Sequence, residues 1–139
     1  MVSMPRMKFW QEFRIHKGKY DNVGIIWIDA HPDVSTVNDG YPNAHAMVLG
    51  SLMGQSAMQI VTQMRNPVFK PDEILYVGLQ PLHDYQEAFL KKTGVNYKVQ
   101  DQAFVTDEEI KAFMTRFDHI LCHKVSVYFL GVYQVTWHL

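Results

Sequence analysis

A short apolar segment that ends in ionisable residues constrains the fold of this chain more than any other feature. Residues 23–33 read VGIIWIDAHPD, and residues 23–28 are apolar, mostly β-branched and preceded by the turn formers Asp21 and Asn22. Such a run is typical of a buried strand in a parallel sheet. The polar residues then follow at the carboxyl end of the strand, which is the edge of an open α/β sheet where ligands bind.

Asp29, His31 and Asp33 predict a metal site at this edge, because alternate residues of an extended chain face the same side. In a straight strand, about 3.3 Å per residue would place the two carboxylates roughly 13 Å apart, too far for one ion. Either the chain turns at Pro32, or the residues serve two ions about 3.5–4 Å apart. Oxygen and nitrogen ligands without a thiolate favour Mn, followed by Zn or Fe. A solvated strand end with a surface histidine is equally compatible with these three residues.

The composition is that of an ordinary globular protein. Of 139 residues, 47% are hydrophobic and 19% charged, which suits one domain over residues 1–139. The 13 basic and 14 acidic residues give a formal charge of −1 without a long run of either sign, so no nucleic-acid partner is expected. Cys122 is the only cysteine, and no segment reaches the about 18 consecutive apolar residues of a membrane helix. We therefore expect a cytoplasmic protein without a membrane partner.

Strand and helix signals alternate along the chain. Further strands are expected at residues 74–79, at residues 95–99 and from His119 onward, and helices are expected at residues 3–18, 43–54, 84–94 and after the capping box of Thr106 and Glu109. Residues 125–139 alternate over far more than the usual about five or six strand residues, which predicts a bend or hairpin near Gly131. The pattern predicts an α/β domain with a mainly parallel sheet.

Two loops are expected at the carboxyl edge of this sheet. Residues 34–42 are rich in turn formers, and His45 lies at the polar start of the helix that follows. A histidine there can exchange a proton near neutral pH, although a local hydrogen bond within the loop explains it equally well. Residues 80–84 form the second loop, in which Asp84 is expected to cap the next helix.

The segments WIDAHPD (27–33) and PNAHAM (42–47) resemble the arginase and agmatinase family of metal-dependent ureohydrolases. Members carry Asp-Ala-His-x-Asp at the end of a sheet strand and then a Gly-Asn-x-His-Gly loop, whose glycines are replaced here by Pro42 and Ala46. The segment YVGLQ (76–80) resembles a family strand that ends in Gly-Leu-Arg. The resemblance implies a three-layer αβα fold with a mainly parallel sheet, arginase/deacetylase-like and incomplete in this chain.

The same resemblance implies the roles of individual residues. Asp29 would bridge two Mn ions, while His31 would bind one ion and Asp33 the other. The substrate would contact Asn43, Asp84 and Glu87, and His45 would be the catalytic residue that shuttles a proton or orients the substrate. The implied reaction is hydrolysis of a small guanidino compound of the arginine, agmatine or formiminoglutamate type by a metal-bound hydroxide, a step in arginine metabolism. A homo-oligomer is expected.

The chain also departs from the family pattern. Val125 and Val127 stand where the family has two further aspartate ligands, and no counterpart of its Gly-Gly-Asp-His segment precedes Arg6. We therefore expect one Mn ion or none in this chain. The alternative function is that of a catalytically inactive, truncated homologue that acts only as an assembly subunit or is a relic.

Overall fold

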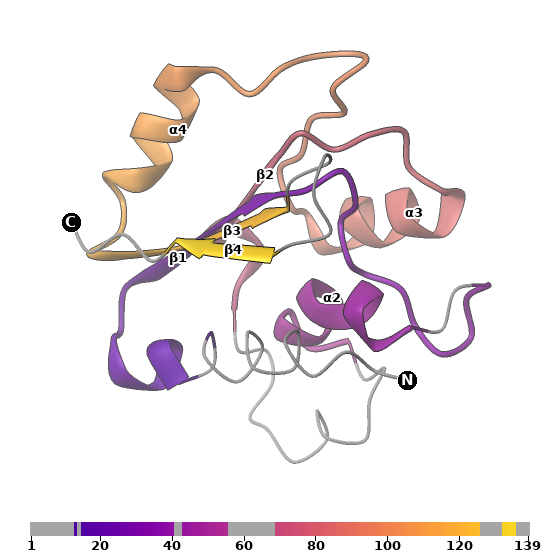
Figure 1. Ribbon diagram of the computed structural model, residues 1–139, viewed down its shortest axis with the longest axis horizontal. Coiled ribbons are helices and arrows are strands. Elements are labelled where there is room, and N and C mark those ends of the chain that lie inside the picture. Colours follow the sequence, from indigo (N-terminus) through magenta and orange to yellow (C-terminus); the bar gives the residue numbers. More distant parts are fainter. Residues whose placement is uncertain (1–12, 14, 41–42, 56–68, 126–131, 136–139) are drawn as a thin grey trace.

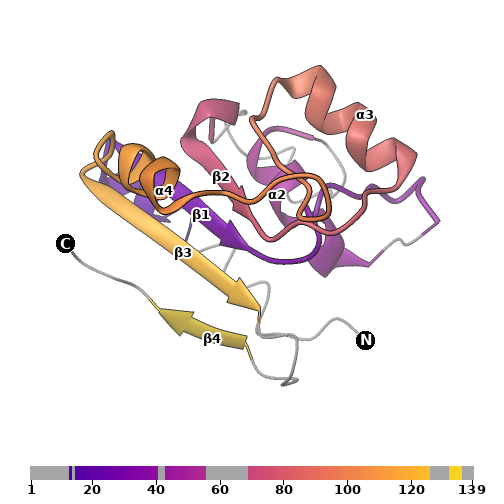
Figure 2. The same ribbon diagram turned by 90° about the horizontal axis from the view of Figure 1, so that it is seen from above.

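A parallel sheet forms the centre of the protein. The computed structural model describes residues 13, 15–40, 43–55, 69–125 and 132–135. Within them a four-stranded sheet has the order β2-β1-β3-β4, with strands β1 (Val23–Ile28), β2 (Ile74–Val77), β3 (His119–Val125) and β4 (Val132–Val135) (Figure 1). β1 pairs in parallel with β2 and β3, whereas β4 is antiparallel to β3 (Figure 2). The mainly parallel sheet is thereby confirmed.

Helices cover both faces of this sheet, which gives three layers. α4 (Asp107–Met114) lies on one face, and α2 (Val48–Leu52) and α3 (Asp84–Thr93) lie on the other (Figure 1). The short 3-10 helices η1 (Ala44–Met47) and η3 (Pro71–Glu73) precede α2 and β2. The αβα arrangement is the one that the family resemblance implies.

The odd-numbered residues of β1 face α2 and α3. Val23, Ile25 and Trp27 are buried in one cluster with Leu49 of α2 and Leu90 of α3. Successive side chains of a strand point to opposite faces, so these three residues share one side of the sheet.

The even-numbered residues of β1 face α4. Ile26 is buried with Phe113 of α4 and Ile120 of β3 in a second cluster. Burial on both faces explains why β1 is a continuous apolar run rather than an alternating one. Among the helices that the structure describes, none has the length and apolar character needed to span a bilayer.

The prediction of a strand at residues 95–99 is wrong. Residues 95–98 have no regular structure, and Val99 forms only an isolated parallel bridge with Leu79. Val95 and Val99 are nevertheless buried, and Tyr97 packs against the same core cluster. The alternating pattern therefore reflects alternate burial of an irregular segment on the core, not pairing with a neighbouring strand.

The ends of α3 and α4 largely follow the sequence signals. Thr106 and Glu109 form the expected capping box, with Glu109 N donating to Thr106 Oγ1 at 3.2 Å and Thr106 N donating to Glu109 Oε2 at 2.8 Å. Gly94, which has a left-handed φ of 76°, caps the carboxyl end of α3 as expected. The cap of α3 is His83 rather than Asp84, because Gln86 Oε1 accepts a hydrogen bond from His83 N.

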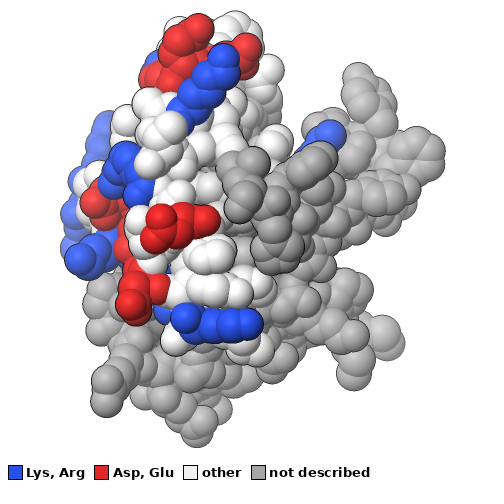
Figure 3. Space-filling model, turned by 90° about the vertical axis from the view of Figure 1, so that its left-hand side faces the viewer, with Lys and Arg blue, Asp and Glu red and all other residues white. Residues whose placement is uncertain are grey.

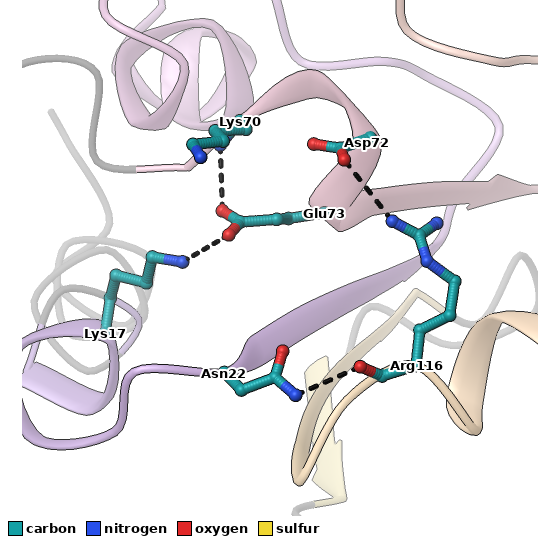
Figure 4. A network of polar contacts seen from close by, with 6 residues as sticks. All are labelled: Lys17, Asn22, Lys70, Asp72, Glu73 and Arg116. Carbon is teal, nitrogen blue, oxygen red and sulfur yellow. Dashed lines mark hydrogen bonds and ion pairs between the residues drawn. The ribbon is translucent and has the colours of Figure 1, made fainter.

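Ion pairs tie the amino-terminal side of the sheet together (Figure 4). Lys17 Nζ lies 2.6 Å from Glu73 Oε1, and Lys70 N donates to Glu73 Oε2 at 2.9 Å. Arg116 and Asp72 form a longer pair at 3.3 Å. Charges of both signs are interspersed on the side of the molecule drawn in Figure 3, so the visible described residues of that side form no patch of one sign.

Candidate functional site

The chain turns sharply after β1. Asp29 N still donates to Val77 O of β2 at 3.2 Å, and Ala30 O accepts a hydrogen bond from Gln80 N. Asp33 then adopts a left-handed backbone with a φ of 52°. Of the two arrangements that the sequence left open, the structure has the turn and not a straight strand.

Neighbouring elements fix this turn. Tyr76 of β2, which is fully buried, donates its hydroxyl to Pro32 O at 2.8 Å, and Gly50 N of α2 donates to Asp33 O at 3.0 Å. The pKa of Tyr76 is raised well above its ordinary value, mainly by burial and to a smaller extent by the negative charges of Asp33 and Asp29. The phenol therefore stays protonated and remains a donor to the turn.

Asp29 is a buried carboxylate between two histidines. Its Oδ1 accepts a hydrogen bond from His31 N at 3.0 Å and lies 3.5 Å from His31 Nδ1, and its Oδ2 lies 3.5 Å from His123 Nε2. The imidazole of His31 is 74% exposed, whereas the side chains of Asp29 and His123 are 8% and 4% exposed. Burial acts to raise the pKa of Asp29, but the His123 and His31 contacts together lower it below the ordinary value.

His123 is the site residue that sequence reasoning missed. It lies on β3 opposite Trp27 of β1, and the two rings stack with centroids 3.8 Å apart and planes 21° apart. The available signal was a polar residue on the same strand face as the buried Leu121. That signal alone does not say which residue of β1 lies beside it.

His45 and Asn43 lie on a segment that is bonded to the loop after β1. Asn43 is the exposed cap of η1, and His45 is half-buried within this short helix. Ser35 N donates to Ala46 O at 2.8 Å, which holds η1 against the loop. The expected polar start of this helix is therefore confirmed as a neighbour of the Asp33 turn.

Asp84 and Glu87 lie in the first turn of α3, which follows β2. Asp84 is exposed, whereas Glu87 pairs with Lys91 at 2.8 Å, and this hydrogen bond lowers the pKa of Glu87. Tyr85 of the same turn shares a hydrogen bond of 2.9 Å with Ser35 of the loop after β1. The loops after β1 and β2 thus meet at one edge of the sheet.

The donor chemistry of this edge suits a divalent cation, but the arrangement does not. Asp29, His31 and Asp33 offer the carboxylate and imidazole ligands that Mn or Zn accept. Throughout the described ranges, however, no group of three His, Cys, Asp or Glu side chains is placed to hold one ion. Of the predicted ligands, Asp29 and His31 contact each other through their side chains, with 3.5 Å between Asp29 Oδ1 and His31 Nδ1. The residues as arranged therefore do not form a metal centre on their own.

This chain is similar to several arginases and to a formimidoylglutamase. Arginase from Bacillus subtilis strain 168 is 31% identical over 78 residues, which are 55% of this chain and 26% of that protein. The structure of Entamoeba histolytica arginase in complex with L-ornithine matches with a TM-score of 0.71 at 21% identity, over 87% of this chain and 44% of that one. Formimidoylglutamase from Bacillus subtilis matches with a TM-score of 0.61 at 15% identity, over 87% of this chain and 36% of that one.

The chain thus matches less than half the length of each of these proteins. The structural matches show the fold, and the sequence match shows shared residues over about half of this chain. A sequence model of the arginase family matches residues 9–130, which is most of the chain. On this match, the chain belongs to the arginase family.

Proposed function

We propose that this chain is a hydrolase of small guanidino compounds, of the ureohydrolase type, with Mn²⁺ as its metal. The observation that carries the proposal is the family match, because residues 9–130 include every predicted site residue. The meeting of the loops after β1 and β2 at one sheet edge supports it further.

Asp29, His31 and Asp33 are the proposed metal ligands. Two of them, Asp29 and Asp33, are buried acids, which proteins keep only with a counter-charge or hydrogen-bond donors. The remaining positions of a coordination shell would be filled by water, by residues outside the described ranges or by a second chain.

Asn43, Asp84 and Glu87 are the proposed substrate contacts. A guanidinium group is planar and cationic, so a carboxylate can accept two parallel hydrogen bonds from it. Asp84 is exposed at the edge, whereas Glu87 would have to exchange Lys91 for the substrate. We therefore propose that Asp84 makes the first contact and that Asn43 binds the polar tail.

His45 is the proposed proton carrier. Hydrolysis of the guanidino carbon–nitrogen bond adds water across it, so the leaving amine takes up a proton as urea or a related amide forms. An imidazole near neutral pH can supply that proton. L-ornithine in the Entamoeba relative and the formimidoylglutamase neighbour support a small amine or amidine substrate, and the proposal covers that class.

Turnover assays test this function. Product release from arginine, agmatine, guanidinobutyrate and formiminoglutamate is measured with and without Mn²⁺. We expect Mn²⁺-dependent turnover of at least one compound and a loss of about 10²–10⁴-fold in kcat for His45→Ala. His119→Asn is the control. His119 is the first residue of β3 and stacks on Tyr20, at the end of this strand that lies away from the candidate site. Absence of turnover with all four compounds in Mn²⁺ overturns the proposal.

We further propose that the protein is a cytoplasmic homo-oligomer. β4 is the terminal strand of the sheet formed by the described residues, and a strand edge readily pairs with another chain. Light scattering at high concentration tests the assembly, and a monomer contradicts it. Cell fractionation tests the compartment.

A further inference from the structure

Protein groups already occupy both carboxylate oxygens of Asp29. The backbone N–H of His31 binds Oδ1 at 3.0 Å, and Nε2 of His123 lies 3.5 Å from Oδ2. A carboxylate removed from water needs such partners, because its charge is otherwise poorly solvated. A divalent cation would also stabilise this charge, so the cation and the His123 imidazole are alternative partners of Oδ2.

His123 is held in this place from two sides. Its position on β3 is fixed by the parallel register that pairs it with Trp27, and its ring is stacked on the indole at a centroid distance of 3.8 Å. The side chain is only 4% exposed. Moving the imidazole away from Asp29 would break its stacking on Trp27, and this loss of contact disfavours the movement.

A cation and the imidazole donor oppose each other at this oxygen. Nε2 carries its proton when it donates to Oδ2, and the positive end of that N–H bond repels a cation bound to the same oxygen.

We propose that His123 is a positioning residue that competes with a divalent cation for the Asp29 carboxylate and weakens metal binding at this edge. The inference rests on the proposed function, since it concerns the same site. On this proposal, His123 of β3 takes the place of the metal beside Asp29 and holds its carboxylate when no ion is bound.

Isothermal titration of the full chain with Mn²⁺ tests the competition. His123→Phe keeps an aromatic ring against Trp27 but removes the donor, so we expect Mn²⁺ to bind about tenfold more tightly. His123→Gln keeps an N–H group at a comparable reach and should stay close to the unchanged chain. His119→Phe is the matched control, because His119 is also stacked on an aromatic ring of the same sheet, Tyr20, and should bind Mn²⁺ unchanged.

Thermal unfolding supplies a second measurement that does not depend on activity. Without Mn²⁺, His123→Phe leaves Asp29 Oδ2 without its partner in a buried place and should lower Tm. Added Mn²⁺ should then raise Tm more in His123→Phe than in the unchanged chain, because a ligand stabilises the state that it binds. This comparison keeps the test decisive even if the variant is less stable.

The outcomes separate this inference from the proposed function. Mn²⁺ affinity that is equal or weaker in His123→Phe overturns the competition, whether or not the unchanged chain binds Mn²⁺. Mn²⁺ binding that persists in Asp29→Asn shows that Asp29 is not a metal ligand. It overturns both the proposed ligand role of Asp29 and the competition of His123 for its carboxylate. Tighter binding in His123→Phe, lost again in the double variant with Asp29→Asn, supports the competition even where the turnover assays fail.

Discussion

Tyr76 donates its phenolic hydroxyl to the carbonyl oxygen of Pro32, 2.8 Å away, and so joins the centre of β2 to the turn that follows β1. Both residues are buried, and the raised pKa of Tyr76 keeps the donor protonated. Tyr76→Phe leaves the carbonyl without this donor, and we expect a loss of about 1–3 kcal/mol in the free energy of unfolding. Urea denaturation measures it. Tyr97→Phe is the control, because the Tyr97 hydroxyl is 3.5 Å from Glu87, and an equal loss there would contradict the prediction.

Glu73 makes a stronger contribution than its neighbour Asp72. Glu73 bonds both Lys17 and the backbone N–H of Lys70, and the Lys17 and Glu73 side chains are 18% and 14% exposed (Figure 4). The Arg116 and Asp72 side chains are 50% and 67% exposed, where solvent screens the pair. We expect Glu73→Ala to cost about 1–2 kcal/mol and Asp72→Ala less than about 0.5 kcal/mol. Chemical denaturation of both variants decides, and the reverse order would refute the ranking.

Cys122 should react slowly in the folded protein. Burial raises the pKa of its thiol above the ordinary 9.0, and the charge of Lys124 offsets this only in part. A raised pKa means less thiolate at a given pH, so alkylation at mildly alkaline pH should be slower in the folded than in the urea-unfolded chain. The difference should shrink as pH rises through the folded pKa. Iodoacetamide labelling followed by mass spectrometry reports on this residue alone, since it is the only cysteine.

The sequence predicts β1 to the residue because local signals agree there. Turn formers precede Val23, and the apolar run ends where the strand ends, at Ile28. The capping box at Thr106 is equally local, because its partners are three residues apart. The false strand at residues 95–99 has the opposite cause, since alternation records burial and not hydrogen-bonded pairing.

The candidate site is predictable only in part for a related reason. Asp29 and Asp33 follow β1 directly, so their place at the sheet edge is a local matter. The contact between His123 and Asp29 depends on the register between β1 and β3, which are far apart in the chain. Register in a parallel pair is set by tertiary packing and is not written into either strand alone.

Two glycines should respond to alanine in opposite directions. A Cβ on Gly24 of β1 would lie 2.6 Å from the Phe117 ring, whereas a Cβ on Gly18 would meet no atom within 4 Å. Gly24→Ala therefore overpacks the face below α4 and should cost about 1–3 kcal/mol. Gly18 lies in a helical segment, so Gly18→Ala should stabilise the protein by about 0.5–1 kcal/mol. Thermal melts of both variants test the pair, and destabilisation by Gly18→Ala would contradict it.

Asp33 combines a special backbone with a proposed metal ligand, and three variants separate the two. Its φ of 52° suits glycine, is tolerated by asparagine and strains alanine. All three variants lose the carboxylate, so their stabilities differ mainly through the backbone, and we expect Asp33→Ala to be about 1 kcal/mol less stable than Asp33→Gly, with Asp33→Asn between them.

Mn²⁺ affinity should behave differently across the same three variants. If Asp33 is a ligand, the affinity falls by a similar factor in all of them, because each lacks the carboxylate whatever its backbone preference. Urea denaturation and Mn²⁺ titration on the same samples distinguish the two effects. Equal stability of the alanine and glycine variants would mean that the turn relaxes when the side chain changes, and an unaltered Mn²⁺ affinity would remove Asp33 from the ligand set.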